Sequence, residues 1–240
     1  MTRAEEIAAN LAAVEERMDS ALLKAKRSSE TIRLVAVSKT VAPEDIAAAL
    51  AAGQRDFAEN YGQEFRDKHK AVAELVAARG LAEPRWHFIG PLQTNKVKYV
   101  AGKVQLVHSV ASAEVLAELE RRAAALNLVQ ECLVQVNVAG EEQKSGIAPA
   151  ELRAVLDRFL SCSHLRCTGL MVIPPYDEDP EQSRRHFAAL RQLRDQEQKT
   201  FRPNVTLHHL SMGMSHDLEV AIAEGATLLR VGTAIFGARA

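Results

Sequence analysis

The first 28 residues carry an apolar residue at every third or fourth position, with polar and charged residues between them. The apolar positions in "RAEEIAANLAAVEERMDSALLKAKR" are Ile7, Leu11, Val14, Met18 and Leu22. This spacing places them on one face of a helix. The pattern predicts an N-terminal helix within residues 1–28 that packs its apolar face against the rest of the protein.

Beyond residue 28, short apolar runs alternate with helical patterns. Eight runs predict strands: "RLVAVSK" (33–39), "DFAENY" (56–61), "WHFIG" (86–90), "LVHSV" (106–110), "CLVQVNV" (132–138), "CTGLMVI" (167–173), "LHHLSM" (207–212) and "LLRVGTAIF" (228–236). Helices are predicted between them, for example at "PEDIAAALAAG" (43–53), "ASAEVLAELERRAAALN" (111–127) and "SHDLEVAIAEG" (215–225). Near-continuous apolar strands that alternate with helices are typical of a parallel sheet covered by helices.

About eight such strand–helix units in this length predict a single (β/α)₈ barrel of the TIM type. An open, doubly wound sheet is the alternative. The chain has no Walker loop and no GxGxxG motif, which disfavours a nucleotide-binding sheet. No repeat, low-complexity tract or linker divides the sequence. We therefore expect one domain over residues 1–240, with the helix of residues 1–28 packed on the barrel.

Composition narrows the class of protein. The chain has 31 acidic and 30 basic residues, so it lacks the broad basic surface of a nucleic-acid-binding protein. Its three cysteines are an odd number at irregular spacing, which argues against a disulfide framework and for a reducing compartment. No segment has the length and apolarity of a membrane span. We expect a cytoplasmic monomer that binds neither nucleic acid nor membranes.

Polar residues recur where the predicted strands end, which is where TIM barrels place their functional residues. Lys39 ends the first strand, Asn60 ends the second, and His87 lies in the third. Each also has a structural interpretation. Asn60 could form a turn, His87 could be a hydrogen-bonded core residue, and Lys39 could extend its ammonium group to the rim. Their joint placement predicts a site at this end of the barrel.

The last two loops, "SMGMSHD" and "VGTAIFG", occupy the place of the usual phosphate site of these barrels. Gly213 and Gly232 let backbone N–H groups approach a phosphate closely. Ser211 and Thr233 add hydroxyl donors, and a helix that starts near Ser215 presents free N–H groups. In the alternative interpretation Ser215 only caps the helix and the glycines only relieve crowding.

Two basic side chains suggest the chemistry of the ligand. Arg230 shares a strand face with Gly232, so it could bind the phosphate or another ligand atom, or form an ion pair at the rim. Apolar surroundings at Lys39 would disfavour the charged amine, and a neutral amine forms a Schiff base with an aldehyde. Aldehydes that also carry a phosphate include pyridoxal 5'-phosphate (PLP) and sugar phosphates.

Seven motifs resemble those of a known family. They are "AVSKT", "AENYGQE", "WHFIGPLQTNK", "VNVAGEEQKSGI", "GLMVIPP", "LSMGMSHDLEVAI" and "RVGTAIFGAR". Their order and composition, from about Arg33 to Arg239, are similar to those of the pyridoxal phosphate homeostasis proteins, which are PLP-binding relatives of the alanine racemase barrel. "AENY" and "SHD" stand where "GENY" and "SDD" are common in the family.

The resemblance implies a fold-type III PLP barrel and a role for each candidate residue. Lys39 would hold PLP as a Schiff base, and Arg230 would face the pyridine nitrogen. Asn60 and His87 would line the pocket. The phosphate would be held by Ser211, Gly213, Gly232 and Thr233. The family has no established catalytic residue, and the sequence leaves open whether Lys144, in "GEEQKSG", is a second PLP site.

Three functions remain open at this stage. The first is a PLP carrier or reservoir in PLP and amino-acid homeostasis, with apo PLP-dependent enzymes as recipients. The second is a PLP-dependent amino-acid racemase, and the third is a Schiff-base aldolase that acts on a sugar phosphate. Racemisation needs an acid and a base on opposite faces of the substrate, and alanine racemases take one from an additional C-terminal domain of the partner subunit. This chain ends directly after "VGTAIFGARA", so the carrier role is the expectation.

Overall fold

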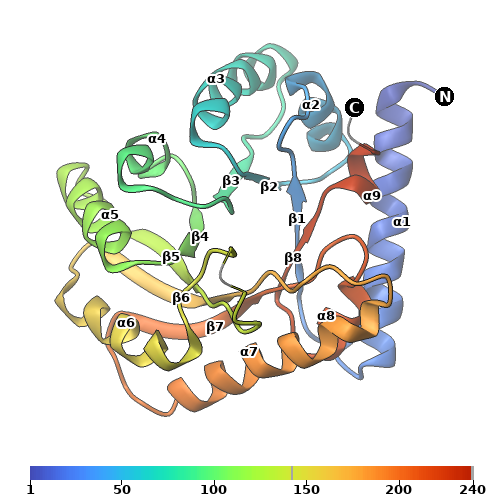
Figure 1. Cartoon of the computed structure of the whole chain (residues 1–240). Coiled ribbons are helices and arrows are strands. Elements are labelled where there is room, and N and C mark those ends of the chain that lie inside the picture. The colour runs from blue at the N-terminus through green and yellow to red at the C-terminus, as the bar shows by residue number, and fades with distance from the viewer. Residues whose placement is uncertain (142, 239–240) are drawn as a thin grey trace.

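Eight parallel strands close into a barrel in the computed structural model of the protein, which describes residues 1–141 and 143–238 (Figure 1). Each strand pairs with the next in the chain, and β8 closes on β1. The strands are β1 (Arg33–Val37), β2 (Asp56–Glu59), β3 (Arg85–Phe88), β4 (Leu106–Val110), β5 (Gln130–Gln135), β6 (Leu165–Met171), β7 (Val205–Ser211) and β8 (Leu228–Val231). The predicted (β/α)₈ barrel is confirmed, and the open-sheet alternative is wrong.

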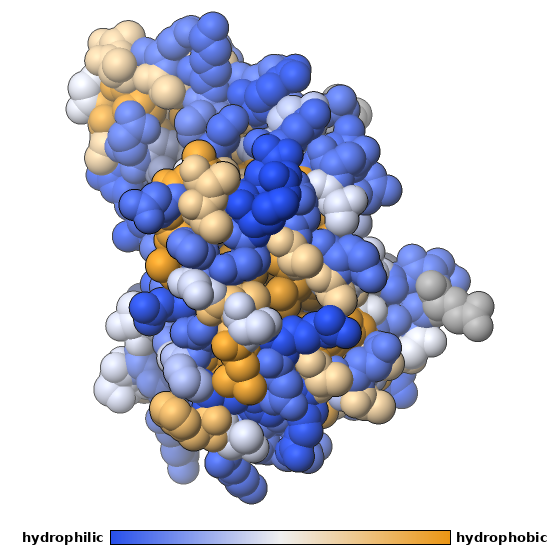
Figure 2. Space-filling model, turned by 90° about the vertical axis from the view of Figure 1, so that its left-hand side faces the viewer, coloured by the Kyte–Doolittle hydropathy of each residue, from blue (hydrophilic) through white to orange (hydrophobic). Residues whose placement is uncertain are grey.

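Helices surround the barrel on its outer side (Figure 1). They are α1 (Arg3–Lys24), α2 (Pro43–Ala51), α3 (Gly62–Arg79), α4 (Val97–Val100), α5 (Ala113–Ala125), α6 (Leu152–Arg158), α7 (Arg184–Glu197), α8 (Leu218–Ala223) and α9 (Thr233–Phe236). Short 3₁₀ helices cover Thr94–Lys96, Pro149–Glu151, Phe159–Ser161 and Pro180–Ser183. No helix of the described ranges is both long and apolar enough to cross a membrane. Hydrophilic side chains predominate on the face in Figure 2, with apolar ones scattered among them.

Most strand positions are buried on both faces of the sheet, so apolar side chains stand at consecutive positions, as in β1. Val35 and Val37 point into the barrel, where a small cluster also contains Ala58, Leu133 and Met171. The intervening side chains pack in a larger cluster between the sheet and the helices. This alternation of period two decides which residues can reach the barrel interior.

The predicted N-terminal helix is confirmed as α1. All five residues of its apolar stripe are buried, and the helix packs against α2, α8 and α9. Thr2 and Glu5 form a capping box, in which each side chain accepts a hydrogen bond from the backbone N–H of the other. Arg17 pairs with Glu219 of α8. The helix therefore covers the seam where the first and last units of the barrel meet.

The last predicted strand, 228–236, is too long. β8 ends at Val231, and the residues after Gly232 form α9, whose N–H groups of Ile235 and Phe236 donate to the Gly232 carbonyl. Asn10 and Arg3 of α1 donate to the carbonyls of Ile235 and Phe236. The apolar run "TAIF" fits a strand or a helix, and docking against α1 selects the helix.

A candidate cofactor site at the C-terminal end of the barrel

Lys39 stands at the mouth of the barrel, two residues after the end of β1. Its side chain is half-buried, and among the described residues no hydrogen bond or ion pair holds its ammonium group. Val35 and Val37 point inward, and Lys39 continues that alternation. The lysine is therefore an amine without a structural partner at the end where TIM barrels bind their ligands.

The turn that carries Lys39 is held by the buried ammonium group of Lys68. Thr40 has a φ of 62°, which is unusual for a β-branched residue, and its N–H donates to Glu64 Oε1 at 2.6 Å. Lys68 Nζ donates to the same oxygen at 2.7 Å, to Glu59 Oε1 at 2.9 Å and to the Ser38 carbonyl at 2.6 Å. Lys68 thus joins the turn to the end of β2 and to α3.

Arg230 of β8 is a cation buried inside the barrel, level with Val35 of β1. Its Nη1 donates to Ser211 Oγ at 2.7 Å and its Nη2 to the Val172 carbonyl at 2.9 Å. Burial lowers the pKa of Arg230 to about 10, against the attraction of Asp217, so the group stays charged at neutral pH. No carboxylate of the described residues accepts a hydrogen bond from it, so the predicted alternative of a rim ion pair does not apply.

The two loops predicted to bind phosphate do come together. Thr233 Oγ1 lies 3.1 Å from Ser215 Oγ, and the Ala234 N–H approaches the same Ser215 oxygen at 3.4 Å. Gly213 has a φ of 91°, and a Cβ there would lie 2.5 Å from Ala221 Cβ, so only glycine fits. Two hydroxyl groups from distant loops thus meet beside glycine-rich backbone.

Ser215 does not start a helix as expected, because α8 begins at Leu218 and Asp217 precedes it as the N-cap residue. Ser215 therefore does not cap α8 as the alternative interpretation predicted, and its hydroxyl instead faces Thr233 Oγ1 and the Ala234 N–H. The sequence signal for this residue is its place in the same Gly- and Ser-rich loop as Gly213. His216, the next residue, is exposed and bonds away from the loops, to the Glu178 carbonyl.

Ser211 and His87 lie deeper than the sequence suggests. Ser211 is fully buried, and its Oγ faces Arg230 and His108 Nδ1, at 2.7 and 2.8 Å, rather than Thr233. His87 is also fully buried, and its ring nitrogens contact Asp56 and His108. His87 therefore matches the alternative of a hydrogen-bonded core histidine, because residues in the middle of a strand cannot reach the barrel mouth.

Asn60 lies at the mouth, directly after β2, and is partly exposed. Gly90 packs against its carbonyl so closely that a Cβ at Gly90 would lie 1.8 Å from the Asn60 oxygen. Lys144 pairs with Glu141 at 2.5 Å, and Asn137 Nδ2 donates to the Glu141 carbonyl at 2.8 Å. Glu142 of this loop and Arg239, which ends the last motif, lie outside the described residues.

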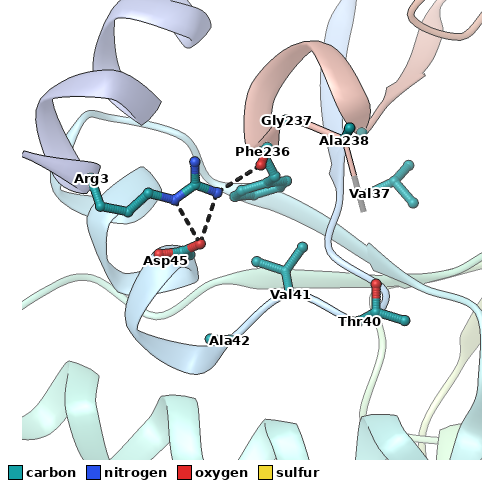
Figure 3. A pocket seen from close by; sticks show the side chains of 10 residues that line it. Arg3, Val37, Thr40, Val41, Ala42, Asp45, Phe236, Gly237 and Ala238 are labelled. Carbon is teal, nitrogen blue, oxygen red and sulfur yellow. Dashed lines mark hydrogen bonds and ion pairs between the residues drawn. The ribbon is translucent and has the colours of Figure 1, made fainter. Parts of the chain in front are cut away.

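A cavity of about 300 Å³ opens beside these loops (Figure 3). Its wall includes Val37 and Thr40, on either side of Lys39, and Gly232 of the second loop predicted to bind phosphate. On the outer side Arg3 closes it, with hydrogen bonds to Asp45 and to the Phe236 carbonyl (Figure 3). The segments that carry the lysine and the phosphate loop therefore border one space.

The chemistry of these donors fits PLP. The unpartnered amine suits an aldehyde, the buried guanidinium suits an acceptor atom on a ring, and the hydroxyl pair with Gly213 suits a phosphate. In the described ranges, no group of three histidine, cysteine or acidic side chains could hold a metal ion. The fit is to an organic phosphate with a carbonyl group.

Comparisons with known proteins identify the family of the chain. A family model described as the N-terminal domain of alanine racemase matches residues 6–240. The pyridoxal phosphate homeostasis protein of Aquifex aeolicus is 46% identical over 229 residues, which are 95% of this chain and 96% of that protein. The chain belongs to the pyridoxal phosphate homeostasis protein family. The resemblance seen in the sequence motifs is thus confirmed.

Other members of this family cover nearly the whole chain. The pyridoxal phosphate homeostasis protein of Escherichia coli K12 is 41% identical over 238 residues, 98% of this chain and 97% of that protein. PipY of Synechococcus elongatus, solved with PLP bound, has a TM-score of 0.82 at 34% identity and covers 96% of this chain and all of PipY. An alanine racemase of Streptomyces lavendulae, at 17% identity and a TM-score of 0.72 over 98% of this chain and 58% of that one, shares the fold.

Proposed function

We propose that this protein binds PLP at the C-terminal end of its barrel and acts as a PLP carrier or reservoir in PLP and amino-acid homeostasis. The single observation that carries the proposal is Arg230, a buried charged guanidinium with no acidic partner among the described residues. A buried charge without a partner is costly, so its place beside the strand that leads to Lys39 favours a bound ligand. The PLP-bound PipY structure supports the same ligand.

Each residue has a distinct task in this proposal. Lys39 provides the amine that links covalently to the aldehyde carbon, and Arg230 donates to the ring nitrogen. Thr233 and Ser215 donate to the phosphate with the backbone at Gly213 and Gly232. Asn60 borders the mouth, while Ser211 and His87 act from the interior. PLP supplies a reactive aldehyde and a ring that can withdraw electrons.

Lys39→Ala is the direct test. Borohydride reduction of the native protein loaded with PLP, followed by mass spectrometry, should place a pyridoxyl group on Lys39. The variant should lose this adduct and its visible absorbance, yet keep weaker binding through the phosphate, whose donors lie in other segments. An unchanged absorbance in the Lys39→Ala protein, with the adduct elsewhere in this site, would contradict the assignment. A sugar-phosphate adduct on Lys39 without PLP would favour the aldolase alternative.

Little or no catalysis on amino acids is expected. A charged Arg230 beside the ring nitrogen disfavours its protonation, and an unprotonated ring withdraws electrons poorly. None of the three tyrosines is a buried acid or base of this site: Tyr61 and Tyr176 are exposed, and Tyr99 packs among the surface cations. Incubation with amino acids in D₂O should give no α-proton exchange above that of free PLP. Fast exchange that Lys39→Ala abolishes would show a racemase instead.

The proposal includes transfer of PLP to apo PLP-dependent enzymes by a cytoplasmic monomer in which residues 1–240 form one domain. It rests on the packing of α1 against α2, α8 and α9 and on a sequence of balanced charge. Holo protein should reactivate a PLP-free aminotransferase, and light scattering should give the mass of one chain. Failure of the holo protein to reactivate the enzyme, when the same concentration of free PLP does so, would refute the carrier role.

A further inference from the structure

A continuous line of buried polar side chains crosses the interior of the barrel. Asp56 Oδ1 lies 3.0 Å from His87 Nε2, and His87 Nδ1 lies 2.9 Å from His108 Nε2. His108 Nδ1 lies 2.8 Å from Ser211 Oγ, which accepts from Arg230 Nη1 at 2.7 Å. The five side chains come from β2, β3, β4, β7 and β8, and at most 3% of any of these residues is exposed. The line connects the N-terminal end of the barrel with the proposed cofactor site.

The two ends of the line fix the direction of every hydrogen bond. Arg230 can only donate, so Ser211 Oγ accepts from it and can still donate its own proton to an unprotonated His108 Nδ1. An ionised Asp56 can only accept, so His87 carries its proton on Nε2. His87 Nδ1 then accepts from His108 Nε2. This single order satisfies all five groups with both histidines neutral.

The surrounding charges favour the same order. Burial lowers the pKa of both histidines, and His108 is further disfavoured as a cation by His87, Arg230, His209 and Arg33. Burial alone would raise the pKa of Asp56, but hydrogen bonds from His87 and Arg85 outweigh it and keep the pKa low. The line therefore holds one protonation pattern at neutral pH.

We propose that Asp56, His87 and His108 are positioning residues that act through Ser211 to hold the Arg230 guanidinium against the ring nitrogen of PLP. This inference rests on the proposed function. Among the described residues no carboxylate holds the guanidinium: the Val172 carbonyl holds its Nη2, and the Ser211 hydroxyl decides the placement of its Nη1. His108 Nδ1 accepts the hydrogen bond of the Ser211 hydroxyl, which leaves an oxygen lone pair directed toward Arg230. Ser211 thereby serves the ring rather than the phosphate.

Three ligands separate these roles: PLP, pyridoxal, which lacks the phosphate, and the carbocyclic PLP analogue in which C–H replaces the ring nitrogen. Ser211→Ala should weaken PLP and pyridoxal by the same factor, about tenfold for a hydrogen bond to a charged group, and leave the analogue unchanged. His108→Leu should do the same, although it does not touch the ligand. Loss confined to the two phosphate-bearing ligands, or equal loss for all three, would overturn the inference.

Ser109→Ala is the matched control. Its hydroxyl is buried on β4 beside His108 but has no hydrogen-bond partner among the described residues, so its removal should change the affinity for none of the three ligands. If Ser109→Ala lowers the preference for PLP over the analogue as much as Ser211→Ala does, the role of the line is also refuted. If the native protein binds no PLP at all, the proposed function is refuted. This outcome is seen in the native protein and is therefore distinct from a failure of the inference, which is seen only in the variants.

The order of protons can be measured without a ligand. Nitrogen-15 NMR of the histidine side chains should show His87 and His108 as neutral Nε2–H tautomers near neutral pH. In Ser211→Ala, the His108 Nδ1 signal should move, because it loses its hydrogen bond, while His216 stays unchanged as an exposed reference. A charged imidazole or an Nδ1–H tautomer at either position would contradict the inference.

Discussion

Arg230 and Lys68 are both buried cations, yet their surroundings give them different roles. Lys68 lies between the carboxylates of Glu59 and Glu64 and also donates to a carbonyl, so its three protons are used within the fold. Among the described residues, Arg230 donates hydrogen bonds only to a hydroxyl and a carbonyl, both uncharged. A buried charge that is hydrogen-bonded only by neutral groups leaves its attraction available to a ligand, and this difference supports the binding role proposed for Arg230.

The hydroxyl pair of Ser215 and Thr233 provides a second test at the scale of single residues. Replacing both, by Ser215→Ala and Thr233→Val, should weaken PLP far more than pyridoxal. Hydrogen bonds to a charged group contribute about 1.5–3 kcal/mol each, and pyridoxal has no phosphate to receive them. Equilibrium binding by fluorescence titration measures both affinities. Thr200→Val, on the exposed surface, is the control, and equal losses for the two ligands would place the phosphate elsewhere.

At the scale of elements, Lys68 is what makes the turn after β1 rigid. The turn contains the unfavourable Thr40 backbone conformation, which Glu64 holds through the Thr40 N–H. Glu59 is fully buried at the end of β2; burial raises its pKa, Lys68 and Ser38 oppose the shift, and its Oε2 has no partner among the described residues. β2, α3 and the residues that follow β1 are therefore coupled through one ammonium group, which holds the carbonyl of Ser38, next to Lys39 in the chain.

Lys68→Met should destabilise the protein by about 3–5 kcal/mol, the cost of leaving a buried carboxylate without its partner. Urea denaturation gives the change in the free energy of unfolding. Lys70→Met, on the exposed side of α3, should have almost no effect. Adding Glu59→Gln to Lys68→Met should recover part of the loss, because no charge then remains buried. A cost equal to that of Lys70→Met would show that the ammonium group does not hold the turn.

At the scale of the whole molecule, the barrel interior is divided between two kinds of packing. One part is filled by apolar side chains such as Val35, Leu133 and Met171, and the other by the polar line from Asp56 to Arg230. The polar part is stable only while its histidines are neutral. One ring nitrogen of each histidine accepts a hydrogen bond there, and a protonated nitrogen could not accept it. The stability of the complete barrel must then depend on pH.

The free energy of unfolding should fall as the pH drops below about 6.5. Burial lowers the pKa of His87 and His108, and that of His209 to about 4, from an ordinary value of 6.5. The unfolded chain therefore binds protons there that the folded protein excludes, which costs about 1.4 kcal/mol per pH unit for each proton. Glu59, whose raised pKa acts in the opposite direction, offsets part of this.

Urea denaturation at a series of pH values from about 8 to about 5 measures this dependence. The free energy should be nearly constant at the upper end and decline at the lower end. His108→Leu should flatten the decline, because one excluded proton is removed. A free energy that stays constant through the whole range would show that the buried histidines are protonated in the folded state.

The sequence by itself determined the barrel and the presence of Lys39, Gly213 and Thr233 at its C-terminal end. Periodicity and strand-end placement depend on local patterns and chain order, which the sequence displays directly. It also determined the family, through long motifs in a fixed order. The extra turn α9 escaped it, because "TAIF" suits two conformations and only contact with α1 selects one.

Only the tertiary structure decided which polar residues face each other. His108 lies in an ordinary apolar run, "LVHSV", and Lys68 lies among the charged residues of α3, so neither has a local signal. Their partners are far away in the chain: His108 contacts Ser211, and Lys68 contacts Ser38. Hydrogen bonds and ion pairs depend on distances of about 3 Å between atoms of different strands, which closure of the barrel sets and chain order does not.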